Sequence, residues 1–265
     1  MFRTILTKTL YEKRWMMLSW SIGVMAMALL MMAFYHSFSG GGFDDILKNL
    51  PKSVQGLVGD LASLKTVPGY VAQEVFALRI PLLTLIMGAT LFSALLAGDE
   101  GDGTLQTLLA QPVTRLRLFG EKYLAGLVIS LVICGAAIVG VLVGLLLIRE
   151  QMSFVRLLQA VVGVWLLTLT FGTLGFAVGA VTGKRGLAGS VSGLLTFSSY
   201  LISSFVTSVA WLAPVEKFSL FHYYNHPAIA SYGLRASSVL VMLGVMAVLL
   251  LGSAIIFLKR DIYQR

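Results

Sequence analysis

Long apolar segments alternate with short polar ones along the whole chain. A helix needs roughly 20 mostly apolar residues to cross the hydrocarbon core of a bilayer, and six segments meet this requirement. They are residues 16–38, 75–97, 123–148, 154–182, 187–212 and 236–258. The pattern predicts an all-α membrane protein with six transmembrane helices, which form a single domain over residues 1–265.

Composition supports this interpretation. Of the 265 residues, 57% are hydrophobic and only 12% are charged, about half the charged share of an ordinary soluble domain. The first apolar segment is longer than the core of a signal peptide, and no small-residue cleavage site follows it, so we interpret it as a retained anchor. The net charge of +8 lies at the flanks of apolar segments. It forms no basic face with interleaved aromatics, so nucleic acid is not an expected partner.

The flanking Lys and Arg residues predict the orientation of the spans, because such residues are enriched in cytoplasmic loops. Twelve fall on the side that holds both chain ends and eight fall on the other side. Three of those eight lie in a long loop, where the rule is weak. Both termini are therefore expected in the cytoplasm.

Two amphipathic segments lie outside the spans. Residues 1–15 place Phe2, Ile5, Leu6 and Leu10 at helical spacing, which predicts a short interfacial helix on the inner membrane surface. Residues 46–67 show a second apolar stripe between glycines and a Pro-Gly pair. We expect a second amphipathic helix there, on the outer leaflet or capping the bundle.

The polar stretch at residues 98–122 predicts a short cytoplasmic helix at residues 103–111. Thr104 or Asp102 can cap it, and Pro112 ends it. Its apolar face carries Leu105, Leu108 and Leu109 at the spacing i, i+3, i+4. A groove on a soluble partner could bury this face. The membrane surface or the chain's own bundle could do so equally well.

The run Glu100-Gly101-Asp102-Gly103-Thr104-Leu105-Gln106-Thr107-Leu108-Leu109-Ala110-Gln111-Pro112-Val113-Thr114-Arg115 resembles the cytoplasmic signature of ABC-2 type transporter permeases. Family members typically read Glu-x-x-x-Gly-Thr-Leu-Glu-x-Leu-Leu-x-x-Pro-Val-Ser-Arg there, so this chain departs mildly at Gln106 and Thr114. The order of the segments also resembles the family over the whole length, including a Pro-containing re-entrant region before the last span.

The resemblance implies a coupling helix that docks on a separate ABC ATPase subunit, with the N-terminal helix packing beside it. The expected coupling residues are Glu100, Gly103, Thr104, Leu105, Leu108, Leu109, Pro112 and Arg115. Exposed leucines are expected to anchor the helix in a groove of the ATPase, and Glu100 to pair with a basic residue of the N-terminal helix or of the partner. The implied architecture is that of type V exporters, built from two permease copies or paralogues in a prokaryotic cytoplasmic membrane.

The chain shows no nucleotide site of its own. The run from Gly179 to Arg185 has the wrong glycine spacing for a phosphate-binding loop and lacks the Ser or Thr that would bind magnesium. ATP and magnesium are therefore expected in the partner subunit, with no cofactor in this chain. Three scattered histidines and the single Cys134 suggest neither a metal site nor a catalytic site.

The fifth apolar segment carries a stripe of hydroxyls. Its members are Ser192, Thr196, Ser199, Ser203 and Thr207. Hydroxyls in a membrane helix can bond to their own backbone, so a packed, slightly bent helix is one interpretation. We favour the other, in which the stripe lines a transport pathway. In other spans, Gly140 and Gly144, and the series 175, 179 and 183, are expected to let helices pack closely within the chain.

The sequence favours a permease that exports a drug, peptide, lipid or other amphiphile and is not itself an enzyme. One alternative is a membrane anchor or assembly factor that transports nothing. The other is an intramembrane hydrolase or lipid-modifying enzyme, which would need ionisable residues deep in the spans. Glu74, Arg79, Arg149, Glu150 and Arg156 all lie at span edges, which disfavours that alternative.

Overall fold

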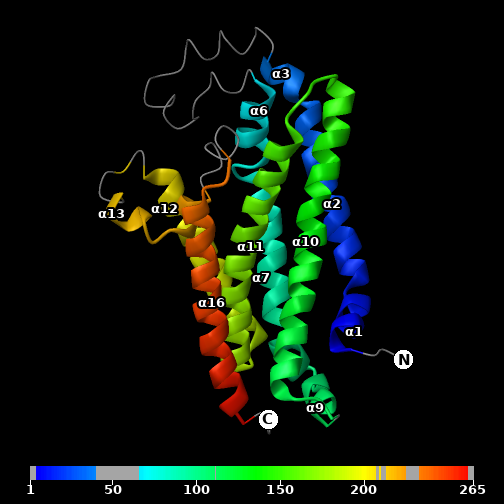
Figure 1. Ribbon diagram of the computed structural model, residues 1–265, viewed down its shortest axis with the longest axis vertical. Helices are drawn as coiled ribbons and strands as arrows, with labels where there is room; N and C mark the ends of the chain where they lie inside the picture. Colours follow the sequence, from blue (N-terminus) through cyan, green and yellow to red (C-terminus); the bar gives the residue numbers. More distant parts are fainter. Residues whose placement is uncertain are drawn as a thin grey trace.

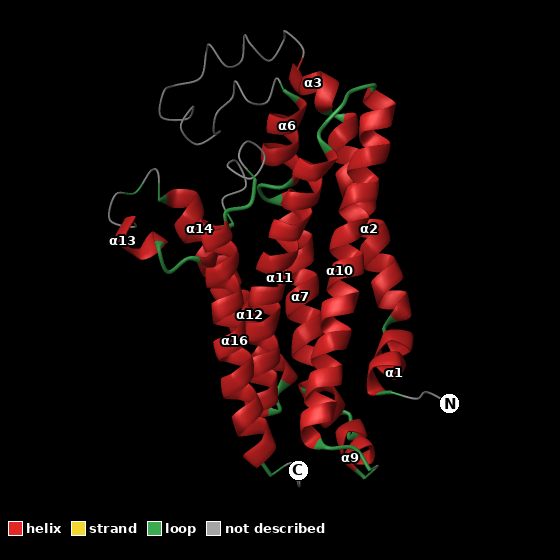
Figure 2. Ribbon diagram, in the orientation of Figure 1, coloured by secondary structure: helices red, strands yellow, loops and turns green. Residues whose placement is uncertain are grey.

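The computed structural model describes residues 4–39, 66–110, 112–206, 209, 213–224 and 233–261. Among these residues every regular element is a helix (Figure 2), which confirms the predicted all-α class. Five stretches are long and apolar enough to cross a membrane: Arg14–Ser37, Val67–Ala94, Arg115–Ile148, Phe154–Thr182 and Ala236–Lys259. The predicted helix at 46–67 falls almost entirely outside the described residues.

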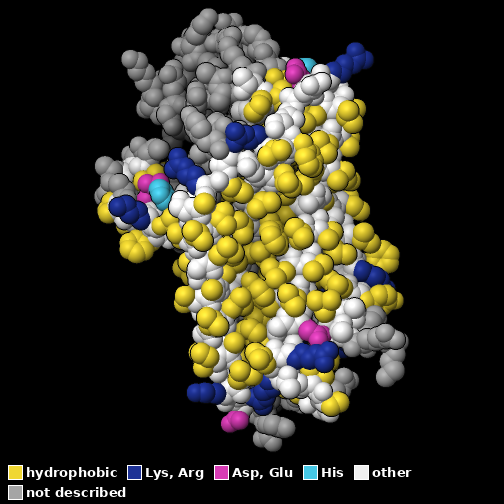
Figure 3. All heavy atoms as spheres, in the orientation of Figure 1, with side chains coloured by type: hydrophobic (Ala, Val, Ile, Leu, Met, Phe, Trp, Pro, Cys, Tyr) yellow, Lys and Arg dark blue, Asp and Glu magenta, His cyan; other side chains and the backbone are white. Residues whose placement is uncertain are grey.

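The helices form an elongated bundle around α11 (Phe154–Thr182), which contacts α7 (Arg79–Ala94), α10 (Arg115–Ile148), α12 (Arg185–Phe205) and α16 (Ala236–Lys259) (Figure 1). In the view of Figure 3, apolar side chains cover the middle of the bundle, and charged ones gather toward its two ends. Such an apolar belt requires lipid rather than water around it. The chain is therefore a multi-pass membrane protein.

The first long helix, α2 (Arg14–Ala33), packs along α10 and continues into the short α3 (Tyr35–Ser39). Gly140 and Gly144 make this close approach possible. A Cβ atom at Gly140 would come within 2.8 Å of the Ala28 Cβ, and one at Gly144 within 2.6 Å of the Met32 Cγ. Their expected role in packing within the chain is confirmed.

The second span is discontinuous and begins earlier than the predicted residue 75. It starts with α6 (Val67–Tyr70) and a π-helix, η2 (Val71–Val75), and α7 begins at Arg79 after a break. The Tyr224 hydroxyl donates a hydrogen bond of 2.7 Å to the Phe76 carbonyl at this break.

One predicted span, residues 187–212, is only partly represented. Helix α12 is 21 residues long and runs from Arg185 to Phe205, but it is not among the five stretches that are apolar enough to cross a membrane. Its many hydroxyls lower its hydropathy. The region that the sequence predicts to be re-entrant contains two short helices, α13 (Ala213–Glu216) and α14 (Leu220–Tyr223).

Both ends of the described chain lie at the same end of the bundle. Helix α1 (Ile5–Glu12), the end of α16 and the short α9 (Thr104–Leu109) occupy the lower end in Figure 1. We call this the α9 end. Ile5 is buried and Leu10 is partly buried, as the stripe in residues 1–15 predicts, while Phe2 lies outside the described residues.

Candidate functional site

The predicted cytoplasmic helix exists as α9, at the point where the chain turns between α7 and α10. A short helix, α8 (Ala97–Gly101), precedes it, and Gly103 joins the two with a left-handed φ of 71°. A residue without a Cβ adopts this conformation readily. Gly103 itself is the N-cap, so the predicted side-chain cap from Thr104 or Asp102 does not form. The Thr104 hydroxyl instead donates to the Asp99 carbonyl at 3.1 Å.

The leucines of α9 face the opposite way from the expectation. Leu105 is 0% exposed and Leu108 is 6% exposed, and Leu109 packs partly against the same core. The expected exposure of these leucines is therefore wrong, because they bury α9 against its own chain; that α9 docks on a partner stays a prediction. The exposed side of the segment carries Thr104, Gln106, Thr107, Ala110 and Pro112.

Glu100 pairs with a residue that sequence reasoning missed. Its carboxylate forms an ion pair with Arg260, just beyond the end of α16, and not with a basic residue of the N-terminal helix. Arg260 also donates from Nη1 to the Val181 carbonyl at 3.2 Å. Because 160 residues separate the two partners, no local pattern in the sequence could have indicated this pair.

Arg115 acts on the end of the same helix. Its Nη1 donates to the carbonyl of Arg260 at 2.7 Å and approaches that of Leu258 at 3.5 Å. The last carbonyls of a helix lack intrahelical partners and carry partial negative charge. A guanidinium at this position therefore stabilises the C-terminus of α16 and connects it to the first turn of α10.

A second ion pair joins α8 to α10. Asp99 pairs with Lys122, whose side chain is only 4% exposed. Burying an ammonium group is costly unless an acid compensates its charge. The Asp99 carboxylate therefore makes the burial of Lys122 possible. Two adjacent acids of α8 thus contact two different helices.

The N-terminal helix is attached to α10 beside this cluster. The Glu121 carboxylate accepts from the Leu6 backbone N–H at 3.0 Å and from the Arg117 Nε at 2.7 Å. A carboxylate at the first turn of α1 satisfies free N–H groups and favours the helix dipole. Helix α1 therefore lies against the first turns of α10, the helix that follows α9.

Most of the hydroxyl stripe on α12 is used for packing. The Ser192 hydroxyl donates to the Phe171 carbonyl of α11 at 2.8 Å. Ser199 and Ser203 each lie 2.8 Å from the hydroxyl of Ser219, just before α14, and the Leu220 N–H donates to Ser199 at 3.0 Å. Thr207 lies outside the described residues. These bonds support the interpretation as packing at three positions; that the stripe lines a pathway stays a prediction.

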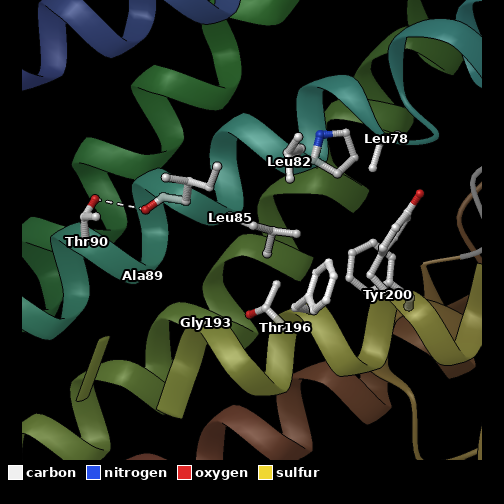
Figure 4. Close-up of a pocket in the computed structure, with 12 residues that line it drawn as sticks. Leu78, Leu82, Leu85, Ala89, Thr90, Gly193, Thr196 and Tyr200 are labelled. Atoms are coloured by element: carbon white, nitrogen blue, oxygen red, sulfur yellow. Dashed lines mark hydrogen bonds between the residues drawn. The ribbon is translucent and has the colours of Figure 1, made fainter. Parts of the chain in front are cut away.

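An apolar groove of about 570 Å³ runs between α7 and α12 (Figure 4), and Phe221 of α14 also lines it. Thr196 of the predicted stripe lines it, but its hydroxyl is bonded to the Ser192 carbonyl of its own helix at 2.7 Å. Thr90 on the facing wall is likewise bonded to its own helix. Tyr200 adds a third hydroxyl to walls formed otherwise by apolar side chains and glycine.

Comparison with known proteins agrees with these features. A search of the curated proteins finds no match to the chain. The model of one protein family, described as ABC-2 family transporter protein, matches residues 4–262. That range holds all the long helices, the α9 end and the groove, so the chain belongs to the ABC-2 transporter family.

Proposed function

We propose that this chain is the membrane-spanning subunit of an ATP-binding cassette exporter. The observation that carries the proposal is the family match over residues 4–262. Proteins of this family are membrane components of transporters and are not themselves catalytic. In the proposed complex, ATP and magnesium are held by a separate ATPase subunit. A second copy of this chain or a paralogue completes the transporter.

The proposed contact with the ATPase is the exposed side of α9. This helix lies at one end of the bundle, away from the apolar belt, and its outward residues are small or neutral and polar. We assign Gln106 and Thr107 to this contact. Leu105 and Leu108 hold the helix in place from behind, and Glu100 and Arg115 position the neighbouring helix ends.

The proposed topology has six spans with the α9 end in the cytoplasm. The position of α1 and of the end of α16 at the same end of the bundle supports an even number of crossings. Five stretches are long and apolar enough to cross, and we assign the sixth crossing to α12, which leads back from the α9 end. The excess of Lys and Arg at the α9 end favours the cytoplasm, in a prokaryotic inner membrane.

The proposed cargo is an apolar or amphiphilic molecule such as a drug, lipid or hydrophobic peptide. The groove between α7 and α12 supports this proposal because two of its hydroxyls, those of Thr90 and Thr196, are bonded to backbone carbonyls. A wall of this kind favours apolar groups over charged ones. Thr196 is the member of the predicted stripe that is best placed to contact cargo.

Co-purification tests the proposal. The chain, expressed with its neighbouring genes and solubilised in mild detergent, should retain an ATPase subunit, and reconstitution should produce ATP-dependent export of an amphiphilic dye. An ATPase that binds without any transport would favour the anchor or assembly factor. No bound ATPase, together with hydrolysis or modification of lipids by the chain alone, would favour the intramembrane enzyme.

A further inference from the structure

Two neighbouring acids anchor α8, the short helix that precedes α9, to two different helices. Asp99 and Glu100 are consecutive residues of α8, and they pair with Lys122 of α10 and Arg260 at the end of α16. Only Asp102 and Gly103 separate α8 from α9. A displacement of α9 that carries α8 with it must therefore either move these two helices or break an ion pair.

Both pairs are partly shielded from water. The side chains of Lys122 and Asp99 are 4% and 21% exposed, and those of Arg260 and Glu100 are 18% and 28% exposed. Exposed ion pairs contribute little because water screens them, whereas breaking a shielded pair leaves a charge without compensation. These pairs can therefore couple a movement of α8 to α10 and α16.

Arg260 extends the connection to two more helices. Its Nη1 donates to the Val181 carbonyl in the last turn of α11, and its own carbonyl accepts from Arg115 in the first turn of α10. One residue thus joins α8, α10, α11 and α16 at the α9 end. Its guanidinium is held through Nη1 by the Val181 carbonyl and through Nη2 by the Glu100 carboxylate.

The space for Glu100 is created by a glycine. Gly183 follows the end of α11 with a left-handed φ of 67°, and a Cβ at this position would collide with both oxygens of the Glu100 carboxylate. The third member of the glycine series at 175, 179 and 183 therefore serves the acid of α8, in addition to ending the helix. The end of α11 therefore contacts both members of the Glu100–Arg260 pair, through the Val181 carbonyl and through Gly183.

We propose that Asp99, Glu100, Lys122 and Arg260 form an ionic clamp that positions α9 and transmits its movement to α10 and α16. Lys122 and Arg260 lie outside the signature run at residues 100–115, and they act as positioning residues. The transmission part rests on the proposed contact between α9 and an ATPase. The positioning part concerns this chain alone.

The positioning part is tested without the ATPase. Spin labels at Thr107→Cys on α9 and Leu142→Cys on the exposed side of α10, in a Cys134→Ala background, report the position of α9 in nanodiscs. Arg260→Gln should broaden the distance distribution between the labels. Lys259→Gln is the matched control, because it removes one charge from an exposed neighbour on the same helix end and should leave the distribution unchanged. Equal distributions in the two variants would overturn the clamp.

The transmission part is tested in the assembled complex. Arg260→Gln should retain ATPase binding but reduce cargo-stimulated ATP hydrolysis roughly fivefold or more, a size typical of coupling between residues in contact. The exchanged pair Glu100→Arg with Arg260→Glu should recover much of the stimulation, which general loss of packing would not allow. If Arg260→Gln couples like Lys259→Gln, the clamp does not transmit. Absence of an ATPase from the wild-type complex would instead refute the proposed function and leave the spin-label result standing.

Discussion

Replacing Leu105 by Ala should loosen α9 from within and not at a partner surface. The Leu105 side chain is fully buried, while its neighbour Gln106 is exposed. The two residues therefore separate the inner and outer sides of one short helix. If the leucines faced an ATPase, Leu105→Ala would instead weaken docking and leave the isolated chain unchanged.

The expected size follows from burial. Truncating a fully buried Leu to Ala typically costs about 2–5 kcal/mol. Helix α9 has only six residues, so it retains few other contacts to offset this loss. A cost of 2 kcal/mol raises the equilibrium constant for local opening about thirtyfold. Amide exchange in such a segment reports the free energy of its own opening, so it measures this change directly. Gln106→Ala should change this free energy by less than about 0.5 kcal/mol, as exposed positions usually do.

Hydrogen–deuterium exchange of the purified chain in nanodiscs measures this difference. Peptides that cover residues 97–110 should exchange at least about thirtyfold faster in Leu105→Ala than in the wild type, and Gln106→Ala should match the wild type. In the complex, Gln106→Ala should weaken binding of the ATPase more than Leu105→Ala does, because it removes a side chain at the proposed contact. Unchanged exchange in Leu105→Ala would refute the inward orientation of the leucines.

Two further predictions concern the bundle. Gly140→Leu should lower the free energy of unfolding by about 1–3 kcal/mol, because it overpacks the contact between α2 and α10, whereas Gly135→Leu on the same helix has open space for its side chain; equal thermal stability of the two variants in nanodiscs would contradict the close packing. Ser219→Ala should cost about 1–3 kcal/mol, because it removes the hydroxyl bonded to Ser199 and Ser203. The exposed Ser204→Ala is its control, and unfolding of both variants at the wild-type temperature would show that these bonds do not hold α14 to α12.

The long helices could be predicted because lipid imposes a simple rule on sequence. Residues 154–182 form a helix with the predicted bounds, and the last helix ends within one residue of the prediction. Helix α10 begins at Arg115, eight residues before the predicted span, because Thr114 caps a first turn that carries charges outside the apolar belt. Hydropathy predicts the part of a helix that lies in lipid, but it does not predict how far the helix continues outside the lipid.

Partners in space were harder to predict than elements. The leucines of α9 have a clear apolar stripe, but a stripe shows only that a helix must bury one face and does not show against which surface. The hydroxyls of α12 were equally ambiguous, because the same spacing suits a pathway and a set of interhelical hydrogen bonds. The sequence did not indicate Arg260 as a site residue, since the enrichment of Lys and Arg at the cytoplasmic ends of spans already explains a basic residue there.

The most direct test of the proposed function is a photo-crosslink from α9 in the native membrane. A benzophenone amino acid at Thr107, on the exposed side of α9, should capture a soluble subunit whose peptides contain a phosphate-binding loop followed by Lys and Ser or Thr. The same probe at Leu142 on the lipid-facing side of α10 should not capture it. Capture of this ATPase at Thr107 alone is the predicted result. Its absence at Thr107, from membranes in which the chain is folded and abundant, would contradict the proposal that α9 couples this permease to ATP hydrolysis.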